Sequence, residues 1–364
     1  MEPPRRIRRI LAAMSGGVDS SVAAALLVEE GYDVIGAMMK FPVYGTSREN
    51  SCCGSEAVES ALRAAKKLNI PFKFYDHVES FNREVVEYFC REYARGRTPN
   101  PCAVCNRALK FNGLFKKAGR LGADSIATGH YARIEKDNSG RYLLKKGKDE
   151  TKDQSYFLFL LSQKQLARIK FPLGNYRKDE IKKIAKELGL KVHDRPESQE
   201  ICFVQDDYRE FLKEMADAGK FNMDKSIFKP GDMVTADGKK VGTHQGIAFY
   251  TVGQRRGLGA HNRPVYVVNI DAANNRVIIG DDEELFVKEL TADNVNWIDR
   301  EKLAAPAEFS VKIRYQHKGA PARVVLGKEG SVKITFKEPQ RAVTPGQAAV
   351  FYRGETVSGG GWIK

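Results

Sequence analysis

The chain has 364 residues, 42% of them hydrophobic, and a formal net charge of +14 at pH 7. This length exceeds one ordinary core, so we expect two or three domains. The excess of Lys and Arg favours a polyanionic partner such as RNA, although a charged surface also serves solubility alone. No apolar run is long enough to span a membrane, and the run after the first arginines is too short for a secretory leader.

The cysteines are too few and too unevenly spaced for a disulfide scaffold. We therefore expect a reducing, cytoplasmic setting in which some of the thiols take part in chemistry. Three of them carry no role that the sequence indicates, and we expect them to be core or incidental thiols: Cys52, Cys53 and Cys90.

The stretch Ala13–Ser21 reads Ala-Met-Ser-Gly-Gly-Val-Asp-Ser-Ser and organises the first part of the chain. An apolar run, 7–12, predicts a strand before it, and helical spacing over 22–30, ended by Gly31, predicts a helix after it. Backbone N–H groups at such a turn bind phosphate. No Lys follows the glycines, which excludes the P-loop motif, and Asp19 would hold Mg²⁺ rather than touch a phosphate.

Strand and helix patterns alternate through the first half of the chain. This alternation predicts a parallel sheet covered by helices on both faces. Ligands bind beyond the carboxyl ends of such strands, so we expect 15–21, Met39 and Gly129-His130 to meet in one crevice. The expected strands are 33–39, 71–75 and 125–127, and the expected helices are about 56–68, 81–93, 162–169 and 178–188.

A stiff turn at 96–101 precedes a helix that we expect to begin near Cys102. Cys105 would then lie in an early helical turn, where the dipole lowers the thiol pKa. Cys102-x-x-Cys105 alone fits a redox pair, half a zinc site or chance, but the chain has no second such pair for a zinc ribbon. Cys202 follows a polar turn, 195–200, and lies in a short apolar patch, where a lone cysteine is usually a core residue.

Beyond about residue 207, the pattern of alternating strands and helices gives way to hairpins and short strands. We expect a helix at 208–218, hairpins at 131–146 and 231–241, and a strand pair at 265–270 and 276–279. Short strands separated by turn residues then predict a small closed barrel, and Arg314-Tyr315 in it is the type of pair that contacts RNA. The expected barrel strands are 309–315, 322–326, 332–336, 348–352 and 355–363.

A set of short motifs, in this order and spacing, resembles the bacterial tRNA-specific 2-thiouridylase family over nearly the whole chain. The first motif looks like the loop of ATP-pyrophosphatases, which split ATP into AMP and pyrophosphate. The motifs are Ser15–Ser21, Gly96–Pro101 with Cys105-Asn106, Ala127–Tyr131, Lys152–Tyr156, Ile201–Phe203, Gly253–Arg255 and Thr344–Gln347.

The resemblance implies a fold and three domains. The fold is an α/β doubly wound parallel sheet of the adenine nucleotide alpha hydrolase-like, Rossmann-like type, followed by a small α+β domain and a C-terminal β-barrel. The implied domains are a catalytic ATP-pyrophosphatase domain at 1–207, a central domain at 208–284 and a tRNA-binding barrel at 285–364.

The implied activity is ATP-dependent 2-thiolation of the wobble uridine of tRNA, with AMP and pyrophosphate as products. Sulfur would arrive from a donor or relay protein, or as sulfide. Family members carry it as a persulfide on the cysteine that matches Cys202. Cys105 would attack this persulfide and leave a disulfide that a reductant reopens. The residues implied to bind ATP, with Mg²⁺, are Ala13, Met14, Ser15, Gly16, Gly17, Val18, Asp19, Ser20, Met39 and Gly129.

The resemblance also implies that the anticodon stem-loop binds and that the target base leaves its stack to be modified. The basic barrel would then act as a clamp on the tRNA. The residues implied to contact tRNA are Asn100, Pro101, Cys102, His130, Lys152, Asp153, Gln154, Arg314, Tyr315 and Gln347.

One position departs from the family pattern. Relatives have Asp, an acid or base, where this chain has Cys102, and a thiol replaces a carboxylate poorly in that role. Cys102, Cys105 and Cys202 would instead suit a [4Fe–4S] cluster that delivers sulfide to the base. Persulfide and cluster mechanisms, a thiolase acting at another tRNA position, and a non-catalytic RNA-binding protein on the same scaffold therefore all stay open at this point.

Overall fold

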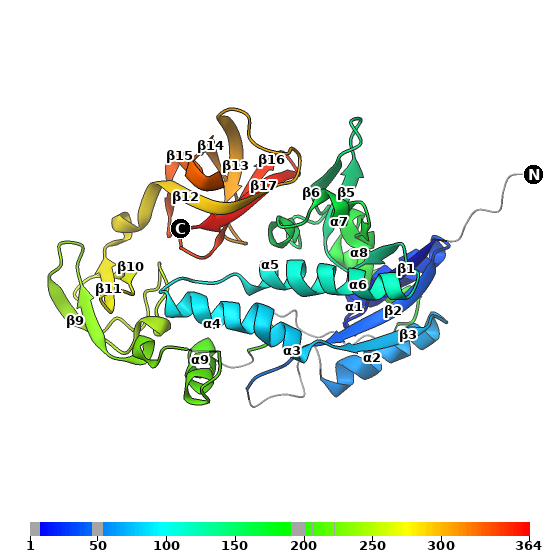
Figure 1. Ribbon diagram of the computed structural model, residues 1–364, viewed down its shortest axis with the longest axis horizontal. Coiled ribbons are helices and arrows are strands. Elements are labelled where there is room, and N and C mark those ends of the chain that lie inside the picture. The colour runs from blue at the N-terminus through cyan, green and yellow to red at the C-terminus, as the bar shows by residue number, and fades with distance from the viewer. Residues whose placement is uncertain (1–7, 46–53, 191–200, 205–206, 222) are drawn as a thin grey trace, which may run out of the picture. The chain divides into compact units, whose positions relative to one another are not determined.

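The computed structural model describes residues 8–45, 54–190, 201–204, 207–221 and 223–364. Cys52, Cys53 and the expected polar turn at 195–200 lie outside the described residues. The chain divides into two compact units (Figure 1). The first comprises Met1–Glu84, Cys102–Asp206 and Glu355–Val357, and the second comprises Val85–Pro101, Asp207–Gly354 and Ser358–Lys364.

The first unit contains a five-stranded sheet in the order β3-β2-β1-β4-β7, in which all neighbouring strands are parallel. Its strands are β1 (Arg9–Ala13), β2 (Asp33–Lys40), β3 (Phe72–Asp76), β4 (Ser125–Ala127) and β7 (Ile169–Lys170). This confirms the predicted fold class. The helix expected over 162–169 was wrong at its end: α7 spans only Gln163–Leu166, and Ile169 pairs with Ile126 in the sheet.

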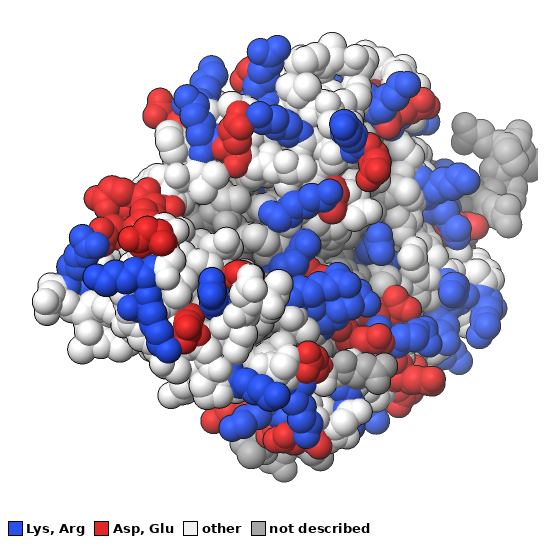
Figure 2. Space-filling view, turned by 60° about the vertical axis from the view of Figure 1, so that its left-hand side comes forward, with Lys and Arg blue, Asp and Glu red and all other residues white. Residues whose placement is uncertain are grey.

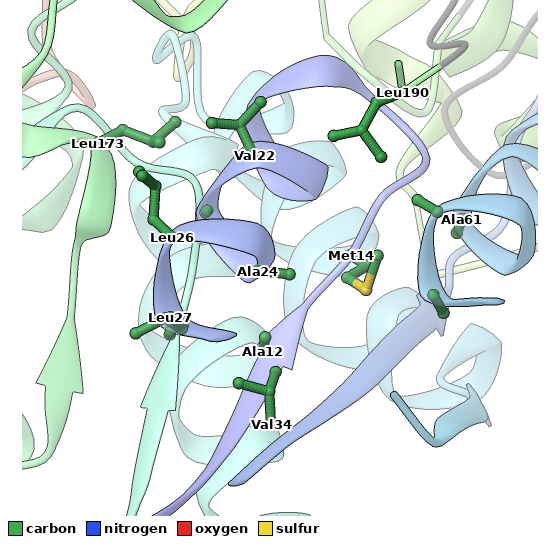
Figure 3. Packing of buried hydrophobic residues seen from close by; sticks show 14 of the residues in the cluster. Ala12, Met14, Val22, Ala24, Leu26, Leu27, Val34, Ala61, Leu173 and Leu190 are labelled. Carbon is green, nitrogen blue, oxygen red and sulfur yellow. The ribbon is translucent and has the colours of Figure 1, made fainter. Parts of the chain in front are cut away.

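Helices cover both faces of this sheet. On one face, α1 (Val18–Glu29), α2 (Ser55–Lys67) and α8 (Lys178–Glu187) contribute apolar side chains to one cluster that includes Ile10 and Ala12, alternate residues of β1 (Figure 3). On the other face, α6 (Asn112–Arg120) packs against β1 and β4. Helix α1 is buried from Ser20 to Leu27, as expected of a helix that is apolar all round. Gly31, which follows the C-cap Glu30, has a φ of +80°, as is common just after a helix.

Two of the predicted helices contain π-helical turns. The helix expected at 81–93 consists of α3 (Val78–Phe81), the π-helix η2 (Asn82–Val86) and α4 (Glu87–Ala94). The helix expected from Cys102 starts at α5 (Pro101–Cys105) and continues through the π-helix η3 (Asn106–Phe111) into α6. Proline is well suited to a first helical position because it lacks the N–H that would have no acceptor there.

The first unit also contains the predicted hairpin and several short helices. Residues Thr356 and Val357 pair with β6 in this unit. The elements are β5 (Ala132–Lys136), β6 (Tyr142–Lys146), η4 (Ser155–Leu158) and η5 (Pro172–Asn175).

The second unit contains a mixed four-stranded sheet in the order β10-β11-β8-β9, which confirms the hairpin and strand pair expected there. Helix α9 (Tyr208–Asp217) and three short 3₁₀ helices accompany it. The elements are β8 (Gly231–Val234), β9 (Lys240–His244), β10 (Tyr266–Asp271), β11 (Arg276–Gly280), η6 (Lys225–Phe228), η7 (Ile247–Phe249) and η8 (Asp282–Leu285).

Six antiparallel strands of the second unit close into the predicted barrel, because β12 pairs with both β15 and β17. The long strand β12 was not among the predicted strands. The barrel strands are β12 (Phe286–Trp297), β13 (Ala307–Lys312), β14 (Ala320–Leu326), β15 (Val332–Arg341), β16 (Ala348–Arg353) and β17 (Thr356–Ile363), with η9 (Lys328–Gly330) before β15. The domain boundaries at 207/208 and 284/285 stay predictions.

Charged side chains of both signs lie at the surface. On the face drawn in Figure 2, Lys and Arg side chains are spread among Asp and Glu. Within the described residues, no helix combines the length and the apolar character that crossing a bilayer requires.

Candidate nucleotide and sulfur-transfer site

The loop between β1 and α1 presents the N-terminus of a buried helix. Gly17 is the N-cap and has no side chain to cap the helix, so the first backbone N–H groups of the helix can serve a ligand. The serine hydroxyls hold the loop closed: Ser20 Oγ accepts a hydrogen bond from the Ser15 N–H at 3.1 Å and donates to the Gly17 carbonyl at 3.1 Å. This geometry suits a phosphate group.

Two glycines allow neighbouring segments to approach this loop closely. An ideal Cβ on Gly16 would lie 2.2 Å from the carbonyl oxygen of Ala57 in α2. An ideal Cβ on Gly129 would lie 3.0 Å from the backbone nitrogen of Ser20. The structure therefore brings Gly129, at the end of β4, to the loop as the sequence predicted, and neither position has room for a side chain.

The carboxylate of Asp19 is held by Lys178 and Tyr131, neither of which was predicted to be a site residue, although Tyr131 ends one of the motifs. Lys178 Nζ lies 2.7 Å from each Asp19 carboxylate oxygen, and Tyr131 donates its hydroxyl hydrogen to Asp19 Oδ1 at 2.8 Å. Lys178 is the first residue of α8. A lysine at the first position of a helix is unfavourable, because its charge opposes the helix dipole. This unfavourable position was the sequence signal that could have pointed to a partner for Lys178.

Gln154 and Asp153, two predicted tRNA contacts, make internal hydrogen bonds. Gln154 exchanges hydrogen bonds with the Tyr131 backbone: its Oε1 accepts from the Tyr131 N–H and its own N–H donates to the Tyr131 carbonyl. Asp153 is 6% exposed and accepts from the Gly147 and Ser155 N–H groups. Gln154 thus positions Tyr131, and with it Asp19, whereas Asp153 fixes the neighbouring backbone and Lys152 is partly exposed.

His130, another predicted tRNA contact, is buried at 8% exposure. Its Nδ1 lies 2.7 Å from Thr128 Oγ1, and its ring lies 5.9 Å from that of Phe111 and 5.8 Å from that of Phe171. Burial, together with the charge of Lys110, holds the pKa of His130 well below its usual range. The neutral, enclosed ring supports the turn that places Gly129.

The predicted sulfur-carrying residues lie in the first unit. Cys105 is the last residue of α5 and only 6% exposed, so the thiol that the resemblance implies as the attacking group is covered in this structure. Cys102 is exposed. Desolvation raises the pKa of its thiol, and the Lys110 ammonium offsets only part of this rise. Cys102 is therefore a thiol near pH 7.

Cys202 is exposed and lies in a turn anchored to the segment after β2. The Val204 N–H donates to the Ile201 carbonyl, and the Tyr44 N–H donates to the Phe203 carbonyl at 2.9 Å. The ring of Phe203 also lies 5.4 Å from that of Phe81. These contacts hold Cys202 beyond the carboxyl end of β2, the strand that carries Met39, which is 9% exposed. Core burial, the simplest expectation for a lone cysteine, was wrong for Cys202.

The three cysteines proposed as cluster ligands do not form a ligand set. Across the described residues, which include Cys102, Cys105 and Cys202, no group of three His, Cys, Asp or Glu side chains is placed to hold a metal ion. The [4Fe–4S] cluster therefore stays a prediction for which the described residues show no ligand group.

In the second unit, the Gly96–Pro101 segment is held by the Thr344–Gln347 segment. Gln347 Nε2 donates to the carbonyl oxygens of Thr98 and Pro99 at 3.1 and 3.0 Å, and the Thr98 N–H donates to the Pro345 carbonyl. Asn100 is buried, with its N–H 3.5 Å from the Tyr88 hydroxyl oxygen. The motifs that share this unit thus fix one segment, which ends at the buried Pro101.

Arg314 is exposed and Tyr315 is half-buried beside the barrel. Arg314 donates to the Arg341 carbonyl at 3.1 Å, and Lys312 Nζ lies 5.9 Å from the centre of the Tyr315 ring. A fixed guanidinium next to an aromatic ring with a second cation is a surface that suits RNA phosphate and bases.

A parallel α/β sheet with a phosphate-binding turn after its first strand defines a nucleotide-binding domain. Three family models match the chain. The tRNA methyl transferase HUP domain matches residues 8–206, the tRNA methyl transferase PRC-barrel domain matches 220–281, and the aminomethyltransferase beta-barrel domain matches 287–363.

The chain belongs to the tRNA-specific 2-thiouridylase family. It is 51% identical over 360 residues to tRNA-specific 2-thiouridylase MnmA of Heliobacterium modesticaldum, covering 97% of this chain and 92% of the relative. It is 49% identical over 364 residues to that of Acetivibrio thermocellus, covering 98% and 99%. It is 46% identical over 362 residues to that of Clostridioides difficile, covering 98% of each chain.

Proposed function

We propose that this protein is an ATP-dependent tRNA-uridine 2-sulfurtransferase that converts the wobble uridine of tRNA to 2-thiouridine. One observation carries the proposal: a helix N-terminus built for phosphate lies in the same unit as an exposed cysteine and a covered one. ATP supplies what the reaction lacks, because adenylating the C2 oxygen of uridine turns it into a leaving group.

The loop at 13–20 and Gly129 would bind the phosphates of ATP, and Met39 would contact the adenine. Mg²⁺ would arrive with ATP as a hard cation that prefers oxygen ligands, and Asp19 is the carboxylate beside the phosphates. Both oxygens of Asp19 are engaged by Lys178 and Tyr131, so binding Mg²⁺ requires Asp19 to exchange a partner.

Sulfur transfer would proceed through a persulfide on Cys202, whose exposure allows a donor protein that itself carries a persulfide to pass on its outer sulfur and keep a thiol. The Cys105 thiolate attacks Sγ of Cys202, a Cys105–Cys202 disulfide forms, and the S–S bond of the persulfide breaks to release HS⁻. HS⁻ attacks C2 of the adenylated uridine, AMP leaves, and the proton on sulfur is lost to give the thiocarbonyl. A dithiol reductant then reopens the disulfide and is itself oxidised.

This order of events requires Cys105 to become uncovered, since it is 6% exposed. We infer that Cys105 stays covered until tRNA and ATP bind. This cover would protect the persulfide on Cys202 from attack before the substrate is in place. The tRNA contacts proposed from the resemblance are Asn100, Pro101, Cys102, His130, Lys152, Asp153, Gln154, Arg314, Tyr315 and Gln347. Of these, Arg314 and Lys152 offer exposed or partly exposed cations, and His130 and Asp153 would act by positioning others.

Two other functions are less well supported. A non-catalytic RNA-binding protein would not need an intact phosphate loop and a reduced, exposed Cys202. Methyl transfer, the reaction that two of the family-model descriptions name, makes no use of paired cysteine segments. A cytoplasmic location follows from the proposed tRNA substrate and the reduced thiols.

Nucleoside analysis of tRNA tests the function directly. Unmodified tRNA is incubated with the full chain, Mg–ATP, a sulfur donor and a dithiol, then digested and analysed for 2-thiouridine. We expect wild-type protein to form it and Cys105→Ala and Cys202→Ala to form none. Cys90→Ala is the control, because burial raises the pKa of Cys90 to about 12 and keeps it unreactive. Thiolation by Cys202→Ala at the normal rate would refute the assignment.

A further inference from the structure

The phosphate loop has no lysine of its own. Residues 15–21 contain two glycines, three serines, a valine and an aspartate, so the only charge in the loop is negative. A helix N-terminus supplies a partial positive charge of about half a unit, whereas the triphosphate of ATP carries several negative charges. The site needs a cation from elsewhere in the fold.

Lys178 is placed to supply that cation, although it lies 159 residues from Asp19 in the sequence. The Lys178 N–H donates to Asp149 Oδ2 at 3.0 Å, which fixes the first turn of α8. Ile181 and Ala185 of α8 pack in the same apolar cluster as the side chains of α1. The two helices are therefore held together, and the Lys178 ammonium is kept at the N-terminus of α1.

The Lys178–Asp19 ion pair is accessible rather than sealed in the core. The two side chains are 17% and 31% exposed. Asp19 is the second residue of α1 and precedes Ser20. The backbone nitrogen of Ser20 lies beside Gly129, at the phosphate-binding end of the helix. An anion at these N–H groups would thus meet the Lys178 ammonium, and Asp19 would still be hydrogen-bonded to Tyr131 if Lys178 left it.

We propose that Lys178 is the phosphate-binding lysine of this site and that it exchanges Asp19 for a phosphate oxygen when ATP binds. The exchange leaves Asp19 able to face the Mg²⁺ that accompanies ATP, so one movement creates both a phosphate contact and a metal ligand. Without a nucleotide, each charge neutralises the other and the loop stays closed. This inference rests on the proposed use of ATP at the loop.

Binding of inorganic pyrophosphate to the full chain, measured by calorimetry with and without Mg²⁺, tests the exchange. Without Mg²⁺, we expect Lys178→Met to weaken binding by about 10- to 100-fold, because a charge-assisted hydrogen bond is lost and Asp19 is left to repel the ligand. We expect Asp19→Asn to tighten binding by about two- to fivefold, because it releases Lys178. With Mg²⁺, Asp19→Asn should lose this advantage.

Two further variants separate charge from packing. Lys178→Arg keeps the cation and should recover most of the affinity. Lys183→Gln removes an exposed lysine from the same helix and should bind pyrophosphate like the wild type. Thermal unfolding of the ligand-free variants reports any loss of the link between α1 and α8.

The proposal can be refuted because it expects the two single variants to change the affinity for pyrophosphate in opposite directions. If Lys178→Met and Asp19→Asn both weaken Mg²⁺-free pyrophosphate binding, the pair serves only to hold the helices and the exchange is wrong. If Lys178→Met binds as tightly as the wild type, Lys178 does not touch phosphate. If the wild-type chain binds neither pyrophosphate nor ATP, the proposed function itself fails.

Discussion

The carbonyl oxygen of Ala57 occupies the space that a side chain on Gly16 would need, 2.2 Å from the ideal Cβ position. Gly16 also has a φ of +79°, which other residues adopt only with strain. Gly16→Ala should therefore lower the free energy of unfolding by about 2–4 kcal/mol and weaken ATP binding by about tenfold or more, because the loop must move away from α2. Urea unfolding and ATP titration measure the two effects.

Gly31→Ala is the matched control for this variant. Gly31 has a φ of +80°, but no atom lies within 4 Å of its ideal Cβ. Alanine there should cost only about 1–2 kcal/mol from backbone strain and leave ATP binding unchanged. Equal effects of the two substitutions would show that contact with α2 does not shape the loop.

Gln347 should stabilise the protein even when no RNA is present. Its amide donates to the carbonyl oxygens of Thr98 and Pro99. Gln347→Ala leaves both without this donor, so the free energy of unfolding should fall by about 1–3 kcal/mol in RNA-free buffer. An unchanged denaturation midpoint combined with weaker tRNA binding would instead make Gln347 a direct RNA contact.

Arg314 should contribute to RNA affinity through charge. It is exposed and held in place by the Arg341 carbonyl. Arg314→Gln should weaken tRNA binding and reduce the slope of log affinity against log salt by about 0.7–0.9, the value for one phosphate contact. Arg63→Gln, which removes a charge of α2 paired with Glu59, should leave this slope unchanged. Equal slopes for both variants and the wild type would exclude Arg314 from the interface.

Burial of His130 should make the protein less stable in acid. The pKa of His130 is lowered in the folded state. Below about pH 6.5, His130 is therefore protonated in the unfolded chain but stays neutral in the folded chain. Stability should be constant above about pH 7.5 and fall as the pH drops from about 6.5 to 5, by up to about 1.4 kcal/mol per pH unit for this group.

The substitution His130→Asn should reduce the slope of stability against pH without abolishing it. Three other histidines also have lowered pKa values for which burial is the main cause: His77, His244 and His317. Denaturant midpoints measured every half pH unit would test this. Slopes that match in the variant and the wild type would mean that His130 takes up its proton over the same pH range in the folded and the unfolded chain.

Cys102 should affect the rate of thiolation but should not bind iron. It is a thiol near neutral pH and can donate a proton. Cys102→Ala should slow thiolation by about 10- to 100-fold, and Cys102→Asp, which restores the residue that the resemblance gives to relatives, should recover activity. Anaerobically purified protein should contain no stoichiometric iron. Iron that is present in the wild type and lost in Cys102→Ala would favour the cluster mechanism instead.

Local patterns were sufficient to predict most of the fold. The apolar runs of β1 and β2 and the helical spacing of α1 predicted a parallel sheet, because each pattern is complete within a few residues. Strand β7 was missed because two residues carry no periodicity and Ile169 becomes a strand only by pairing with Ile126.

The site was predictable where a motif lies in one segment and not where it depends on distant partners. The loop at 15–21 and its contact with Gly129 follow from a turn and a strand end. Asp19 pairs with Lys178, and Phe111 and Phe171 bury His130. These partners lie far away in the sequence, so the residues next to Asp19 or His130 do not predict them.

The order of strands in the sheet has a consequence for biosynthesis. Strand β1 pairs with β2 soon after both emerge from the ribosome, but its other neighbour, β4, lies roughly 115 residues later in the chain. At typical rates of translation that interval is about 6–20 s, during which an apolar strand edge has no partner. The newly made N-terminal segment is thus a natural client for chaperones, and slowing translation between β2 and β4 would lengthen the period in which it can aggregate.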